Sequence, residues 1–512
     1  MAETGTTAWG PKATSREWIG LAVLALPCVL YSMDLTVLNL AVPALTADLQ
    51  PSAAQLLWIV DIYGFLVAGS LITMGTLGDR IGRRRLLMIG AVAFGAASLL
   101  AAFAHTAGAL VAARALLGVA GATLAPSTLS LIRNMFHDPG QRTFAIGIWV
   151  TSYSVGAAIG PLLGGVMLHY FWWGSVFLLA VPVMVLLLIL APILLPEYRD
   201  EAAGRLDLAS AALSLAAVLA MIYGIKLIAE HGPGWLPALS IGTGLLLGAL
   251  FLRRQRHLDA PLIDVSLFRS PVFSASLAIN LFAVFSAAGA FLFVAQYLQL
   301  VLGLAPFHAG LWTLPSSLAF IAASMLTPIL LRRLRPTDVM VAGLAVAALG
   351  FTLLALIDRS SGPALLAVAS SVFALGLAPV FTLTTDVIVG AAPPERAGAA
   401  AALSETGAEF GGAMGIAVLG SIATAVYRGA LPDLGPMALP PGAAEAARST
   451  LGGAAAVAGQ LAPEAGAALL ETARGAFMKA FDTAALVTAG ISVTAAVVAA
   501  TLLRRTRPAA AG

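Results

Sequence analysis

The chain consists of long apolar runs joined by short charged connections. Hydrophobic residues make up 60% of its 512 residues and charged residues 10%, whereas soluble domains are about 25% charged. One core in water cannot bury so many apolar side chains, so lipid must serve as part of the solvent, and we predict an all-α membrane protein. Fourteen runs are long enough to span a bilayer: 18–42, 53–77, 86–104, 108–132, 143–168, 172–195, 207–229, 235–252, 272–301, 306–331, 338–357, 363–390, 397–427 and 480–503.

Basic residues are distributed unevenly between the connections. With an even number of spans, both termini lie on one side, and the connections on that side hold 21 of the 28 Lys and Arg residues. The positive-inside rule then predicts a multi-pass protein of the inner (cytoplasmic) membrane with both termini cytoplasmic. The first run follows Lys12 and Arg16, contains Asp34 and leads into further spans, so we expect an uncleaved spanning helix.

Several functional classes are excluded by what the sequence lacks. The net charge of +3 arises from short basic clusters between apolar runs, which excludes a nucleic-acid-binding face. Cys28 is the single cysteine, so no internal disulfide or cysteine-based metal site can form. The sequence contains neither the Gly-Lys of a phosphate-binding loop nor a His-Glu-x-x-His motif. We therefore expect neither an ATP-driven pump nor an enzyme, and no cofactor or metal.

Two segments about 253 residues apart resemble each other, 124–142 and 377–396. Each begins with Leu-Ala-Pro and ends with Pro-x-x-Arg, and both have the same membrane orientation. Such a parallel repeat predicts two related six-helix halves. We assign residues 1–200 to the first half, 201–256 to an inserted helix pair and 257–512 to the second half. The long connection 428–479 is expected outside the cell, either as a lid or as a tolerated insertion.

Five carboxylates lie more than two residues from either end of a predicted span, where they are costly and face a cavity or a partner. Glu405 and Glu409 are four residues apart and share one helical face. They lie about 13 and 20 Å along the helix from Arg396, on either side of the bilayer midplane. Asp386 is expected near the cytoplasmic face with a structural role. The five are Asp34, Asp61, Asp386, Glu405 and Glu409.

Two ionised carboxylates on one face repel each other and lose hydration in the membrane. Such a pair can hold either protons or a cation, and this competition is the chemistry of a cation/proton antiporter. We expect Glu405 and Glu409 to bind the cation, with one of them also exchanging a proton. Asp34 is expected to bind chiefly a proton and Asp61 a proton or a cation, and these two are placed to meet. A hydrogen bond between helices is the alternative for each acid.

Aromatic residues near these acids can contact a quaternary ammonium group through their ring faces, or they can simply pack. Lys226 lies in the inserted pair, where we expect it to pair with Glu230 or to reach the membrane surface, with no role in transport. The aromatic candidates are Tyr31, Trp58, Tyr63, Trp149, Tyr153, Phe285 and Phe410.

The connection after the second span, residues 75–85, reads Gly-Thr-Leu-Gly-Asp-Arg-Ile-Gly-Arg-Arg-Arg. It resembles the signature of the major facilitator superfamily between helices 2 and 3, with Gly78 in place of the usual Ala. The resemblance implies a gate between two halves. Gly75 and Gly82 would allow close approach and a tight turn, and Asp79 would pair with basic groups and cap a helix. The basic members of the motif are Arg80, Arg83 and Arg84.

Two further strings resemble motifs of the same superfamily. Arg114 in the fourth span resembles the arginine that is associated with proton coupling. The fifth span carries a run of glycines and a proline over 156–165 that resembles the antiporter motif of exporters. Glycines there would let helix backbones pack closely, and the proline would allow a bend. The residues of this string are Gly156, Gly160, Pro161 and Gly164.

With the strings at 33–43, 57–63 and 404–411 and fourteen spans, nearly the whole chain resembles the drug/proton antiporters of the QacA and SmvA type. The 306–331 span lacks an acidic residue that some relatives carry there. The resemblance implies a major facilitator fold that exports cationic or amphipathic drugs, such as quaternary ammonium compounds and dyes, by alternating access. We expect a monomer in membrane lipid, with protons and a small cation as its partners. A dedicated exporter of one endogenous metabolite or antibiotic remains the alternative.

Overall fold

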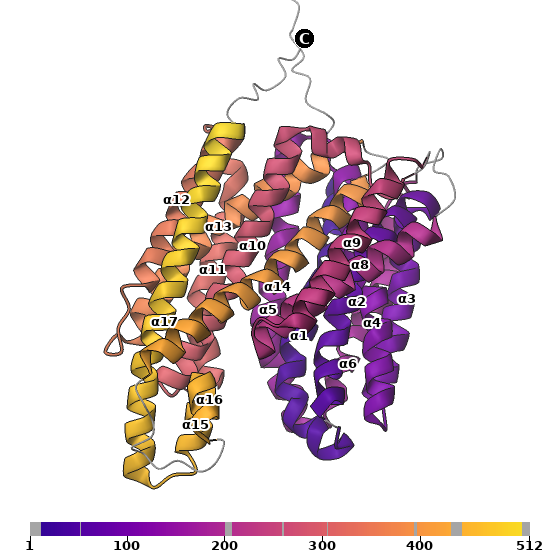
Figure 1. The fold of residues 1–512 in the computed structure, drawn as a ribbon. Coiled ribbons are helices and arrows are strands. Elements are labelled where there is room, and N and C mark those ends of the chain that lie inside the picture. The colour runs from indigo at the N-terminus through magenta and orange to yellow at the C-terminus, as the bar shows by residue number, and fades with distance from the viewer. Residues whose placement is uncertain are drawn as a thin grey trace, which may run out of the picture.

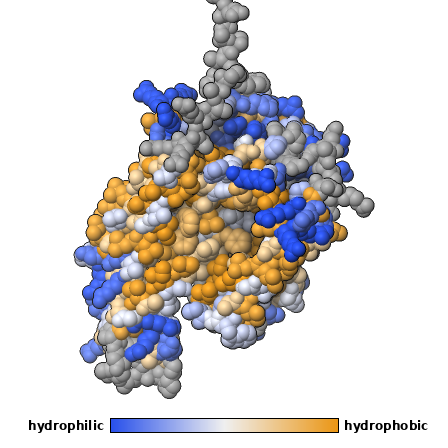
Figure 2. Space-filling model, turned by 45° about the horizontal axis from the view of Figure 1, so that its top comes forward, coloured by the Kyte–Doolittle hydropathy of each residue, from blue (hydrophilic) through white to orange (hydrophobic). Residues whose placement is uncertain are grey.

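The computed structural model describes residues 12–51, 53–199, 207–258, 261–304, 306–393, 397–431 and 443–503. Every regular element in this part of the chain is helical. Fourteen of the helical segments are long and apolar enough to cross a membrane, which confirms the predicted class. Hydrophobic residues form a broad belt around the middle of the molecule, and hydrophilic residues gather at its two ends (Figure 2).

The first half is a bundle that encloses its own apolar core. The run at 172–195 was expected to be one helix, but it is divided at Leu179 into two. The second of these begins just before Pro182, which is tolerated in the first turn of a helix. The helices of this half are α1 (Ser15–Leu49), α2 (Ala53–Ile81), α3 (Arg83–Ala102), α4 (Ala107–Met135), α5 (Pro139–Tyr170), α6 (Ser175–Leu178) and α7 (Ala180–Leu194).

The second half encloses a separate core. Five of its helices begin at a proline, whose fixed backbone angle and missing N–H suit the first helical position. The helices are α10 (Pro271–Gln296), continued by η2 (Tyr297–Val301), α11 (Pro306–Leu330), α12 (Pro336–Leu354), α13 (Pro363–Gly390), α14 (Ala397–Ala430) and α17 (Pro463–Val498), continued by η5 (Ala499–Leu503). The short helix η1 (Val265–Arg269) precedes them.

Equivalent helices of the two halves pack in the same way. Helix α5 lies along α1, and α14 lies along α10. A Cβ atom at Gly156 would collide with the carbonyl oxygen of Val29 on α1, and one at Gly411 with that of Leu281 on α10. Gly156 and Gly411 are 255 residues apart, close to the spacing of the two segments that resemble each other. Both contacts need backbones at van der Waals distance, so the glycines fix how closely each helix pair approaches.

The inserted helices, α8 (Leu208–His231) and α9 (Trp235–Gln255), form an antiparallel pair at the seam between the halves (Figure 1). Helix α8 contacts α2 of the first half and α14 of the second, while α9 packs chiefly on α8. The pair is closed at one end by Arg254, whose Nε donates to Asp207 Oδ2 at 2.6 Å. This guanidinium holds the pKa of Asp207 well below its usual range.

The connection expected at 428–479 joins the last span without a break. Helix α17 begins at Pro463 and passes through the end of the expected connection into the last span. Before it lie α15 (Ala443–Ser449) and α16 (Leu451–Ala458), at the end of the molecule away from the C-terminal end of α17 (Figure 1). Leu451 and Val457 join the core of the second half. Alanine favours a helix whether or not lipid surrounds it, so α17 extends well before the apolar run at 480–503.

We expect the glycine contact between α1 and α5 to tolerate no side chain. Gly156→Val should lower the thermal unfolding midpoint of the purified protein, because overpacking costs about 1–3 kcal/mol. Gly165→Val on the same helix is the matched control, since a Cβ atom there meets nothing within 4 Å. Equal midpoints for the two variants would contradict the assignment.

Candidate functional site

Asp34 and Arg114 form a buried ion pair inside the first half. Arg114 is 0% exposed, and its Nη1 donates to Asp34 Oδ2 at 2.5 Å. Its Nε donates to the Ile59 carbonyl oxygen at 3.2 Å, and its guanidinium lies 4.7 Å from the centroid of the Tyr63 ring. A charge in this environment is costly unless it is paired and hydrogen-bonded. Arg114 therefore ties α4 to both α1 and α2.

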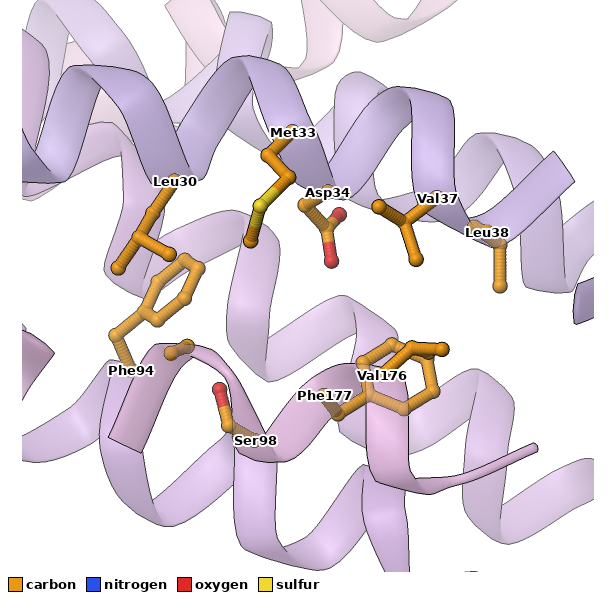
Figure 3. A pocket seen from close by; sticks show the side chains of 10 residues that line it. Leu30, Met33, Asp34, Val37, Leu38, Phe94, Ser98, Val176 and Phe177 are labelled. Atoms are coloured by element: carbon orange, nitrogen blue, oxygen red, sulfur yellow. The ribbon is translucent and has the colours of Figure 1, made fainter. Parts of the chain in front are cut away.

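A small cavity adjoins the Asp34 carboxylate within the first half. Asp34 points into it from α1, opposite Val176 and Phe177 (Figure 3). Its volume of about 20 Å³ is enough for one water molecule beside the carboxylate. The other residues that line it are Leu30, Met33, Val37, Leu38, Phe94, Ser98 and Ala180. The cavity thus leaves room for one water molecule beside the Asp34 carboxylate, among mainly apolar side chains.

Glu409 is held from the opposite half of the protein. It lies on α14 and accepts a hydrogen bond from the hydroxyl of Tyr31 on α1. The centroid of the Tyr31 ring lies 5.8 Å from that of Tyr63, which in turn contacts Arg114. The Tyr63 hydroxyl is buried and has no hydrogen-bond partner among the described residues. Two tyrosines therefore connect the Asp34–Arg114 pair with Glu409.

Glu405 lies one turn before Glu409 on the same helix, as the spacing predicted. It interacts electrostatically with Tyr31, Tyr153 and Cys28 of the first half. Within the described part of the chain it makes no hydrogen bond or ion pair, although it is half-buried. A carboxylate in this setting has free capacity for a proton or a cation.

Asp61 pairs with Lys226, which corrects the expectation that it would meet Asp34. Lys226 on α8 donates to the Asp61 carboxylate on α2, and its Nζ lies 4.8 Å from the centroid of the Phe65 ring. Asp61 does not meet Asp34, because each acid has its own cation. Lys226 was expected to pair with Glu230, whose side chain lies outside the described residues. Sequence reasoning missed the pair because nothing in the sequence placed α8 against α2.

The predicted aromatic residues divide into three groups. Tyr63 and Trp149 lie near the acids: Trp149 meets Tyr153 edge to face, with ring centroids 5.0 Å apart, and donates from Nε1 to Thr128. Trp58 and Phe410 lie toward the inserted pair. Trp58 is 41% exposed with its ring against Phe65, and Phe410 packs on the cluster that joins α2 to α8. Phe285 is buried in the core of the second half.

The signature at 75–85 forms a contact between the halves. Asp79 pairs with Arg83 and also accepts from the backbone N–H groups of Gly398, at 3.4 Å, and Ala399, at 3.1 Å. These N–H groups belong to the first turn of α14, so Asp79 caps that helix and lies at the positive end of its dipole. Gly75 lies directly against Gly398, where a Cβ atom would come within 2.6 Å of its carbonyl oxygen.

Other residues of this motif fasten the turn to its own half. Gly82 separates α2 from α3 with φ 110°, a conformation that favours glycine. Glu197, after α7, accepts from the backbone N–H of Arg84 at 3.1 Å and forms a 3.7 Å ion pair with its guanidinium. Arg80 is half-buried at the end of α2. Arg84 therefore anchors the turn to the first half, while Asp79 and Arg83 contact the start of α14 in the second half.

A second contact closes the same end of the molecule at α5 and α13. Arg142 Nε donates to Asp386 Oδ1 at 2.8 Å, and the hydroxyl of Thr143 donates to Asp386 Oδ2 at 2.8 Å. The hydroxyl of Ser324 on α11 donates to the Gly147 carbonyl oxygen at 3.2 Å. Asp386 was expected to be structural, and it holds the two halves together.

The glycine string of α5 faces α1. A Cβ atom at Gly164 would come within 2.9 Å of Val37, as one at Gly156 would meet Val29. Gly160 is buried between them. Pro161 lies inside α5, which runs unbroken from Pro139 to Tyr170, so the proline does not end the helix. The string is thus packed within the first half and not at the seam.

The protein consists of two helical halves with carboxylates in their membrane-spanning interior. The halves meet through polar contacts at one end that can act as a gate. These features define a membrane transporter. Residues 24–416 match the model of the Major Facilitator Superfamily. The chain belongs to this family, and it is a transporter rather than an enzyme.

Curated relatives are similar over most of their length. The Multidrug efflux pump LfrA of Mycolicibacterium smegmatis is 42% identical over 96% of this chain and 98% of its own. The Methyl viologen resistance protein SmvA of Salmonella typhimurium is 36% identical over 90% and 93%. Among solved structures, the human organic anion transporter MFSD10 has a TM-score of 0.59 at 14% identity, covering 94% of this chain and 98% of its own, which supports the fold alone.

We expect the Arg142–Asp386 pair to hold its end of the molecule closed. In a Cys28→Ser, Ser324→Cys background, Asp386→Asn should raise the alkylation rate of the introduced thiol about tenfold, because an opening made easier by about 1.4 kcal/mol exposes this buried site more often. Asp358→Asn is the control, since the Asp358 carboxylate lies in a turn outside the spans and, among the described residues, accepts only from nearby Ser360 and Ser361. If the two variants are alkylated equally fast, the pair does not act as a gate.

Proposed function

We propose that this protein is a proton-coupled antiporter that exports cationic, amphipathic drugs across the cytoplasmic membrane, with both termini in the cytoplasm. The observation that carries the proposal is the position of Glu405 and Glu409. The two acids lie on one face of α14 at the junction of the halves, one bound by a tyrosine of the first half and the other without a partner among the described residues. A site of this kind attracts a cation and competes for protons.

Exchange follows from the chemistry of these groups. Protons that enter from outside neutralise Glu405 and Glu409 and release the bound cation. When the site faces the cytoplasm, a new cation favours the ionised acids, and the protons leave. Asp34 takes part as a proton site, since Tyr63 and Tyr31 connect its pair with Glu409. The drug and the proton therefore need not occupy the same carboxylate.

Alternating access requires the contacts at the α2–α3 end to break and re-form. Asp79 would leave the first turn of α14, and Arg142 would leave Asp386. Both contacts are polar and few, whereas the glycine contacts between α1 and α5 and between α10 and α14 lie within the halves. This arrangement supports a rocking motion of two rigid halves around the carboxylates.

A dedicated exporter of one metabolite or antibiotic is the second candidate. The Tetracenomycin C resistance and export protein of Streptomyces glaucescens is 33% identical over 82% of this chain and 78% of its own. The higher identity to relatives that are named for multidrug efflux and for methyl viologen resistance favours a broader, cationic range.

The proposal predicts gradient-driven movement of ethidium in liposomes that contain the purified protein. An imposed pH gradient should drive transport by the wild type, and Glu405→Gln and Asp34→Asn should each lower the coupled rate at least about tenfold, because loss of a proton-exchanging group uncouples the cycle. Glu464→Gln, at an exposed acid on α17, is the matched control.

Wild-type rates in both variants would overturn the carboxylate mechanism. If the pH gradient drives no ethidium movement by the wild type, the search would turn to a single neutral or anionic substrate.

A further inference from the structure

Lys226 occupies a position in which a cationic ligand would be recognised. The chain contains three lysines, and Lys226 is the one within the inserted helix pair. Its ammonium group contacts a carboxylate, Asp61, and lies over an aromatic ring, Phe65. A carboxylate and a ring face together form the surroundings that recognise an organic ammonium ion.

Two features make this cation easier to displace than Arg114. Arg114 is fully buried and held by Asp34, by a backbone carbonyl and by the Tyr63 ring. The Lys226 side chain is 34% exposed, and Asp61 is its one hydrogen-bond partner among the described residues. A lysine is also a point charge on a flexible stem, which can withdraw without moving the backbone.

Lys226 also acts on the proposed binding site itself. The charged groups that face it are Asp61 on α2 and Glu409 on α14, and its ammonium group interacts electrostatically with both. Helix α8, which carries it, contacts both of those helices. The inserted pair thus delivers one positive charge to the acids at the junction of the halves.

We propose that Lys226 is a built-in counter-ion that occupies the Asp61 end of the cation site when no substrate is bound, and that a cationic substrate displaces it. This inference rests on the proposed function, since it assumes that the acids bind a cation. The inserted helix pair then has a role in substrate affinity. It keeps the empty site neutralised, so an incoming cation has to bind Asp61 more strongly than Lys226 does.

The test is binding of ethidium to the purified, full-length protein. Lys226→Gln should tighten ethidium binding about tenfold, which corresponds to about 1.4 kcal/mol. Lys226→Arg keeps the positive charge and should not tighten binding, and Lys479→Gln, the matched change at an exposed lysine, should keep the wild-type affinity. In an Asp61→Asn background, Lys226→Gln should no longer tighten binding, because the competition is for that carboxylate.

A second measurement uses the wild-type protein and does not depend on the folding of a variant. Saturating ethidium should increase the rate at which the Lys226 amine is reductively methylated, read by mass spectrometry, with Lys479 as the internal reference. Displacement from Asp61 exposes the amine, so a rate that stays constant or falls would overturn the proposal.

The outcomes separate this inference from the proposed function. Equal or weaker ethidium binding by Lys226→Gln, with normal binding by the wild type, overturns the counter-ion role and makes Lys226 a structural link between α8 and α2. The proposed export of cations would stand in that case. If neither the wild type nor Lys226→Gln binds ethidium, the proposed function fails, and the counter-ion role fails with it.

Discussion

The arrangement of this protein depends on the pairing of charges in a medium that cannot solvate them. A charged side chain at the centre of a bilayer costs about 2.5–3.5 kcal/mol on insertion scales, so each one needs a partner or a cavity. Two ion pairs meet this need inside the spans, Arg114–Asp34 and Lys226–Asp61. Two more, Arg83–Asp79 and Arg142–Asp386, join helices at one end of the molecule. Glu405 has no such partner among the described residues, so its carboxylate is available to a proton or a cation that binds reversibly.

The contact between Asp79 and α14 shows how a closed end can remain reversible. The first N–H groups of any helix lack partners within the helix, and a capping side chain contributes about 0.5–2 kcal/mol. Asp79 supplies that cap from the other half of the protein. Losing it exposes polar groups that water at the membrane surface can satisfy. The halves are therefore held by an interaction strong enough to favour closure and weak enough to break at thermal energies.

Much of this could be predicted from the sequence because its signals are local. Hydropathy located the spans, and the spacing of Glu405 and Glu409 predicted their shared face. The motif at 75–85 predicted that Asp79 would cap a helix, though not that the helix would be α14. What escaped prediction depends on how distant helices pack. The partner of Lys226 follows from the placement of α8 on α2.

The position of α8 across α2 and α14 makes the two flanks of the transporter unequal. On that flank the seam between the halves is covered by a helix pair, whose outer member, α9, presents apolar side chains such as Leu245 and Leu246. On the opposite flank α5 meets α11, and the cavity of about 780 Å³ beside them lies at the end of the molecule that Asp386 helps to close, with Asp138 and Arg332 in its lining. The two flanks of the transporter therefore present different surfaces to the bilayer, one built from an inserted helix pair and the other from the helices of the two halves.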